Sequence, residues 1–110
     1  MYANLVVGVL TQQAGLLALY RECDHDRGIG LFVMAHLVTS IAFFERSRPP
    51  GACTAVHEQC IACQRLCVRI VATDMEGRPV PPELLDEYDE SVARLVGSLN
   101  ELSDSLKAPA

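Results

Sequence analysis

Four of the five cysteines lie in one short stretch of the sequence, between residues 53 and 67. His57, Cys60, Cys63 and Cys67 follow one another at steps of three or four residues, so a helix presents all of them on one face. Thiolates bind Cu(I) and Zn(II), and the imidazole of histidine binds both metals as well. The spacing therefore predicts that these residues form a binding site for Cu(I) or Zn on one face of the helix.

One helix cannot easily surround a zinc ion, so at least one ligand has to come from another helix. His36 is the best candidate, because a count of helical rise along an antiparallel pair puts it level with Cys63 or Gln64. Gln13 falls near the same height. The count predicts one polar layer built from Gln13, His36 and the middle of the cysteine face.

The segment His57-x2-Cys60-x2-Cys63-x3-Cys67 resembles the cysteine-lined helices of the cytosolic copper-storage four-helix bundles. The resemblance implies thiols that point into a helical bundle and hold Cu(I). Those proteins carry cysteines on several helices, whereas Cys23 is the only cysteine of this chain outside the stretch. This difference argues against bulk copper storage.

The same cysteines also suit a purely structural role, since free cysteine is among the most buried residue types and packs as a small hydrophobic residue. A catalytic role would use His57 to activate Cys60 or Cys53, but no motif for an oxyanion hole accompanies them. An odd number of clustered cysteines does not suit a disulfide framework. Packing, metal or thiol sensing, and catalysis all stay open, and a non-enzymatic role is favoured.

The composition limits the classes of partner. A net charge of -5 and a pI near 5.0 leave no basic surface for a phosphate backbone, so nucleic acid is not expected as a partner. The first ten residues lack the positive start of a secretory signal. These features predict a cytoplasmic protein with reduced cysteines.

Apolar residues recur at helical steps along the whole chain, and no stretch shows the alternation of a strand. Proline and glycine interrupt the pattern at residues 49–51 and 77–79, and Asp26 is placed to cap a helix. The sequence predicts an all-α antiparallel four-helix bundle in a single domain, 1–110. Its predicted helices cover about 4–23, 27–46, 53–73 and 82–106.

The predicted helix 27–46 is apolar on nearly every side, so its surface needs more cover than one bundle provides. A second copy of the chain is the simplest cover, which predicts a homodimer. The residues expected at its interface are Met34, Leu37, Val38 and Ile41.

A membrane span is not predicted. The apolar stretch 5–20 is interrupted by Thr11, Gln12 and Gln13, and the stretch 29–44 is shorter than the roughly 20 apolar residues of a spanning helix. Both stretches are expected to be buried core helices.

Taken together, these patterns predict a small non-enzymatic helical bundle that acts as a self-associating interaction or regulatory module, with a further protein as a second kind of partner. The alternative is a metal- or thiol-responsive protein that binds Cu(I) or Zn through the cysteine and histidine face.

Overall fold

The computed structural model describes residues 2–107 of the chain. It contains four α-helices: α1 (Tyr2–Glu22), α2 (Arg27–Arg46), α3 (Thr54–Met75) and α4 (Pro82–Lys107), with a 3-10 turn, η1 (Gly51–Cys53), before α3. No strand occurs in the described residues. The prediction of an all-α fold is confirmed, and Cys53 lies in the turn before α3 and not in the helix itself.

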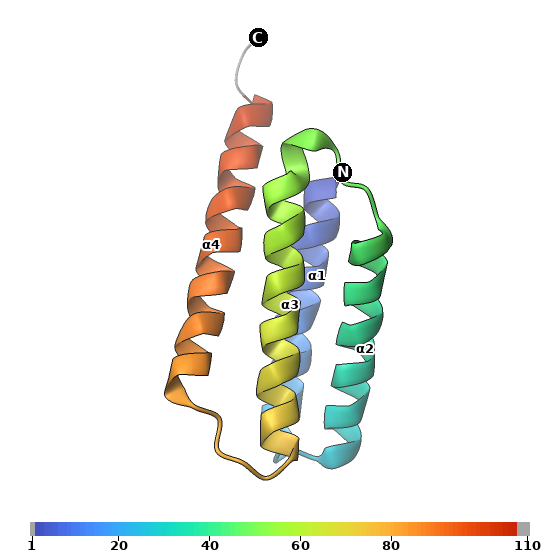
Figure 1. Cartoon of the computed structure of the whole chain (residues 1–110), viewed down its shortest axis with the longest axis vertical. Coiled ribbons are helices and arrows are strands. Elements are labelled where there is room, and N and C mark those ends of the chain that lie inside the picture. Colours follow the sequence, from blue (N-terminus) through green and yellow to red (C-terminus); the bar gives the residue numbers. More distant parts are fainter. Residues whose placement is uncertain (1, 108–110) are drawn as a thin grey trace.

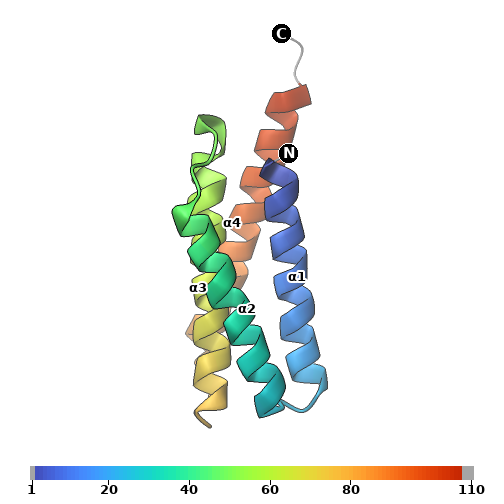
Figure 2. The same cartoon turned by 90° about the vertical axis from the view of Figure 1, so that its right-hand side faces the viewer.

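The helices lie side by side along the long axis, and each runs opposite to the one before it (Figures 1 and 2). The molecule measures 53 × 26 × 20 Å. Helix α3 is central, with α2 and α4 on either side of it, and it packs extensively against both. Helix α1 packs mainly on α3 and α2 and touches α4 little. The packing therefore leaves much of α1 and α2 uncovered.

The connection between α1 and α2 is short and strained. The backbone N–H of His25 donates to the carbonyl of Tyr20 at 3.0 Å, which closes the last turn of α1. Asp24 and His25 both have left-handed φ values, 55° and 57°, where glycine is usual. Each such residue costs about 1 kcal/mol. The side chain of Asp26 then accepts from the backbone N–H of Ile29 at 3.0 Å and caps α2, as predicted.

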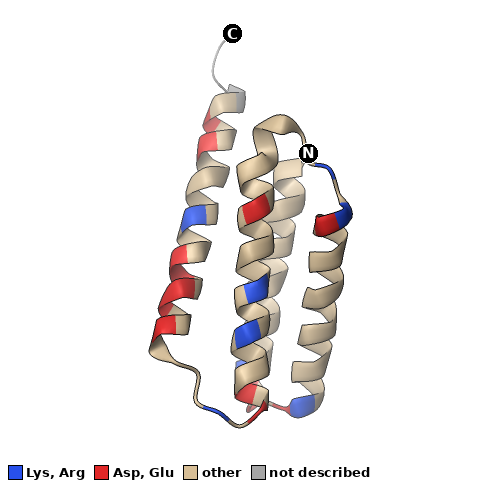
Figure 3. Ribbon diagram, in the orientation of Figure 1, with Lys and Arg blue, Asp and Glu red and all other residues tan. Residues whose placement is uncertain are grey.

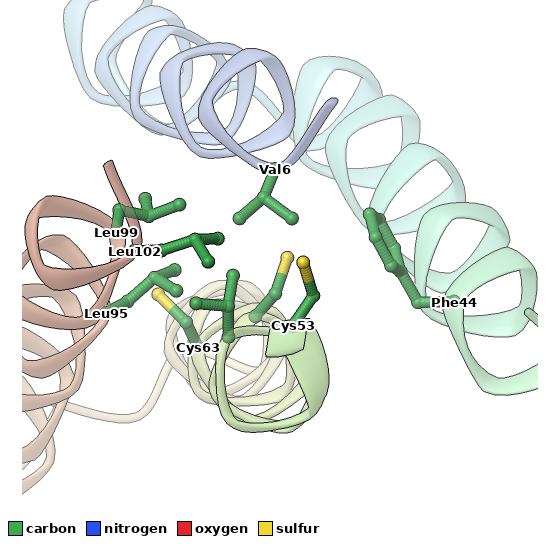
Figure 4. Close-up of a cluster of buried hydrophobic side chains, with 9 residues drawn as sticks. Val6, Phe44, Cys53, Cys63, Leu95, Leu99 and Leu102 are labelled. Atoms are coloured by element: carbon green, nitrogen blue, oxygen red, sulfur yellow. The ribbon is translucent and has the colours of Figure 1, made fainter. Parts of the chain in front are cut away.

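Most of the core falls into two clusters. The upper cluster lies near the connection between α2 and α3 (Figure 4) and consists of Val6, Phe44, Cys53, Val56, Cys60, Cys63, Leu95, Leu99 and Leu102. The lower cluster lies near the connection between α1 and α2 and consists of Leu17, Tyr20, Val33, Leu37, Cys67 and Val71. Helix α3 contributes to both, which explains its central place.

Gly30 lets the start of α2 approach α1 and α3 closely. A Cβ atom at this position would lie 2.7 Å from Sδ of Met75 and 2.8 Å from Cε1 of Tyr20. Both distances are too short for any larger residue without a shift of its neighbours. This glycine thus fixes the position of the Tyr20 ring at the lower end of the molecule.

Candidate functional site

The cysteine face of α3 points into the core. Cys60, Cys63 and Cys67 are almost completely buried, Cys53 is buried beside them, and all of them are free thiols. Figure 4 shows Cys53 and Cys63 among Val6, Phe44 and the leucines of α4. The cysteines therefore form one wall of the packed interior.

A buried polar layer crosses the cysteine face. Nε2 of Gln13 donates to the hydroxyl of Tyr88 at 2.9 Å and lies 3.3 Å from Sγ of Cys63. These contacts join α1, α3 and α4. The predicted proximity of Gln13 to the middle of the cysteine face is present, and Tyr88 of α4 is a further member of the layer that was not predicted from the sequence. His36 makes no hydrogen bond to any described residue, and the α2 residues that join Cys67 in the lower cluster are Val33 and Leu37.

His57 lies away from the middle of the cysteine face. Its Nδ1 is hydrogen-bonded to the hydroxyl of Tyr2, and its ring centroid lies 5.9 Å from that of Phe44. Within residues 2–107, no group of three or more His, Cys, Asp or Glu side chains has an arrangement that could hold a metal ion. The predicted ligands are not gathered into one site: Cys60, Cys63, Cys67, His57 and His36.

Burial changes the acid–base chemistry of the thiols. It raises the pKa of Cys60 to about 11, with the nearby Cys63 as a further cause. It raises the pKa of Cys67 to about 12. The pKa of Cys63 is also raised by burial, although hydrogen bonds with Gln13 and Ser91 oppose the change. At neutral pH these thiols are protonated, so they are poor nucleophiles.

We expect the cysteines of the folded protein to differ widely in their rates of alkylation near neutral pH. Cys23, which is only half-buried, should react first. Cys60 and Cys67 should react at least about 100-fold more slowly, because their raised pKa values lower the thiolate fraction and the core excludes the reagent. Peptide mass spectrometry after timed alkylation measures each site. Labelling in denaturant is the control and should make all five sites similar; fast native labelling of Cys60 would restore the catalytic hypothesis.

The most exposed apolar surface lies on α1 and α2, which stand side by side in Figure 2. Its large apolar side chains are between 42% and 60% exposed. We call the exposed sides of α1 and α2 together the outer face, and their large residues are Leu5, Val7 and Leu19 of α1 and Leu31, Phe32, Val38 and Phe43 of α2.

The outer face is free of charge along most of its height. No Asp, Glu, Lys or Arg occurs in residues 2–20 or 28–44. Figure 3 shows that both helices are uncharged except at their ends, while α3 and α4 carry charges along their length. The upper end of the outer face carries Glu45, Arg46 and Arg48. The lower end carries Arg21, Glu22, Asp24, Asp26 and Arg27.

The residues of α2 that face outward in the structure differ from those predicted for the interface. Leu37 and Ile41 are 1% and 9% exposed and lie inside the chain, and Met34 is half-buried. Among the four residues expected at an interface, only Val38 belongs to the outer face. A helix that is apolar on all sides has no polar side, so its composition alone does not show which residues face outward.

The prediction that the two apolar stretches are buried core helices is wrong. In α1 and α2, only 17% and 28% of the most apolar window is buried. Both helices are long and apolar enough to cross a membrane, by length and composition. This finding overturns the prediction of no membrane span and removes the basis for a cytoplasmic location. Uncharged polar residues do not end an apolar helix, and α1 continues through Thr11, Gln12 and Gln13 over its 21 residues.

Searches of known protein families, curated proteins and solved structures found no match to the chain, so its function has to be inferred from its own geometry.

Proposed function

We propose that this chain is a self-associating interaction module in which two copies pack their outer faces against each other. The observation that carries the proposal is the uncharged outer face, with seven large apolar side chains exposed along α1 and α2. Monomeric soluble proteins rarely expose large contiguous apolar patches, and such patches usually mark interaction sites.

The charges at the two ends of the outer face favour a second copy as the partner. The upper end has two arginines and one glutamate, for a net charge of +1. The lower end has two arginines, one glutamate and two aspartates, for a net charge of -1. A two-fold dimer with antiparallel copies would place each upper end against the lower end of its partner, so opposite net charges would meet.

Small residues on α1 also suit close helix packing. Gly8 and Gly15 lie on its exposed side, and a Cβ atom at either position would meet nothing within 4 Å. The backbone of α1 is thus open to approach by another helix. Thr11 and Gln12 between them can hydrogen-bond to a protein partner.

Sedimentation velocity tests the proposal. The wild-type chain should sediment as a dimer, and Phe32→Glu or Val38→Glu should weaken the dimer by at least about 100-fold, because each buries a charge in an apolar interface. Both positions are more than half exposed, so the fold of each copy should persist. Val96→Glu is the matched control, since Val96 is 41% exposed but lies on α4 outside the outer face. A wild-type monomer at all concentrations would refute the proposal.

A vesicle assay tests whether the outer face contacts a second copy of the chain or a lipid bilayer. The bilayer has to be tested because α1 and α2 also have the length and composition of spanning helices. Wild type and Phe32→Glu are mixed with vesicles of zwitterionic lipid and centrifuged on a density gradient. A dimer that stays with the soluble fraction supports the proposal. Wild type that floats with the vesicles, with Phe32→Glu left behind, would assign the outer face to the bilayer and overturn the dimer.

A further inference from the structure

A small pocket lies at the lower end of the molecule, outside the cysteine layer, and Arg21 belongs both to its wall and to the charged lower end of the outer face. It has a volume of about 190 Å³ and opens between α1, the end of α3 and the connection from α3 to α4. One half of its wall is apolar and consists of Leu17, Ile70, Val80 and Leu85. The other half is polar and consists of Tyr20, Arg21, His25 and Asp74.

Asp74 organises the polar half. Its Oδ2 accepts a hydrogen bond from the hydroxyl of Tyr20 at 2.5 Å and lies 2.6 Å from Nδ1 of His25. The Tyr20 bond, followed by His25 and Arg21, lowers the pKa of Asp74, although partial burial opposes this. Both contacts fall on one oxygen of an ionised carboxylate. They hold the His25 ring by Nδ1 and leave Nε2 without a partner among the described residues.

Arg21 supplies an uncommitted positive charge beside this group. Its guanidinium forms no ion pair with any side chain in the described part of the chain. Among the described residues that line the pocket, Asp74 alone is acidic, and its Oδ2 is already engaged by Tyr20 and His25. The pocket can therefore accept a single negative charge at its polar end.

The backbone at the pocket has an unusual conformation. His25 contacts Asp74 from a turn in which Asp24 and His25 both adopt left-handed conformations. The ring of Tyr20 then packs against that of His25, with centroids 5.0 Å apart. Strained conformations of residues other than glycine concentrate at functional sites, where the surrounding contacts maintain them.

From this arrangement we infer that the pocket binds a compact monocarboxylate. The carboxylate pairs with the guanidinium of Arg21 beside the ring of His25, and the apolar body lies against Leu17, Ile70 and Leu85. Pockets for drug-sized ligands have volumes of roughly 300–1,000 Å³. At about 190 Å³, this pocket suits a single ring or a short branched chain.

Three probes with the same ring and different head groups test the class of ligand: benzoate, benzyl alcohol and benzylammonium. Each is titrated into the full chain and followed by two-dimensional NMR of the backbone amides. Benzoate should shift the signals around Tyr20, His25 and Leu85 and bind at least about 10-fold more tightly than the alcohol, because only benzoate pairs with a cation. Equal binding of all three probes, tighter binding of benzylammonium, or no shifts with any probe would each overturn the inference.

A variant of Arg21 tests the cationic partner. Arg21→Gln should weaken benzoate binding by at least about 10-fold, since it removes the fixed charge. Arg94→Gln is the control, because Arg94 is an exposed arginine of α4 outside the pocket wall, and it should leave binding unchanged. Unchanged binding in Arg21→Gln would overturn the assignment of Arg21.

His25→Gln tests the contribution of His25 at constant pH. The groups around His25 are Tyr20 and Arg21 of α1 and Asp74 of α3, while Asp24, Asp26 and Arg27 are exposed at the same end. The variant should weaken benzoate binding, because the ring of His25 forms part of the polar half of the wall. Unchanged binding in His25→Gln would remove His25 from the site. The dimer is tested with Phe32→Glu and Val38→Glu, which lie outside the pocket wall, so the dimer and the ligand can fail separately.

Discussion

Replacement of Phe44 by alanine should lower the free energy of unfolding by about 3–5 kcal/mol. Phe44 has no exposed surface and lies in the upper cluster, where it attaches α2 to α3 (Figure 4). Its ring packs edge-to-face on Tyr2, with centroids 6.4 Å apart, and lies against His57. Such a loss is a large part of the roughly 5–15 kcal/mol that stabilises a domain. Urea unfolding followed by circular dichroism measures the change.

Phe43→Ala provides the matched control at the next position. Phe43 is 55% exposed on the outer face, so its removal should change the stability of the isolated copy by only about 0.5 kcal/mol. In the proposed dimer it should instead weaken association, which makes the unfolding midpoint more dependent on protein concentration. Equal losses for Phe43→Ala and Phe44→Ala at low concentration would contradict the inward orientation of Phe44.

The protein should also lose stability steeply in alkaline solution. The pKa of a cysteine thiol is 9.0 in the unfolded chain, whereas burial raises the pKa of Cys60 to about 11 and that of Cys67 to about 12. The unfolded state therefore releases protons that the folded state keeps. The contribution of these thiols is fully present below about pH 9 and is lost as the pH rises toward the folded values, by up to about 1.4 kcal/mol per pH unit for each group.

Denaturant midpoints measured from neutral pH to about pH 11 test this slope. Cys67→Ala should make the stability fall less steeply with pH, because the variant lacks one of the thiols whose pKa differs between the folded and the unfolded state. Val96→Ala is the control and should leave the slope unchanged, since valine has no titratable group and Val96 is 41% exposed. A stability that does not depend on pH above about 9 would show that the thiols ionise without unfolding.

The helices could be predicted from the sequence because apolar periodicity and the proline and glycine breaks are local signals. The bounds of α2 agree with the prediction, and α3 extends to Met75, beyond the predicted end at residue 73. The rise per residue of a helix also predicted that Gln13 lies at the height of Cys63, where the structure has it. The same count failed for His36, because rise gives the height of a residue and not the direction in which the helix turns its side chain.

The pocket at the lower end could not be predicted in this way. Tyr20 and His25 are 54 and 49 residues away from Asp74 in the sequence, and no local pattern links them. In the sequence, Asp24, His25 and Asp26 have the composition of an ordinary turn with a capping aspartate. Only the fold reveals that the connection between α1 and α2 lies against the end of α3.

The sparse packing of α1 has a consequence for access to the interior. This helix buries only four of its 21 residues, Val6, Gln13, Leu17 and Tyr20, whereas α2, α3 and α4 pack as consecutive neighbours. Segments with few buried contacts open at a lower free energy than the whole molecule. Undocking of α1 would remove Gln13 from Cys63 and Tyr88 and would bring water to both.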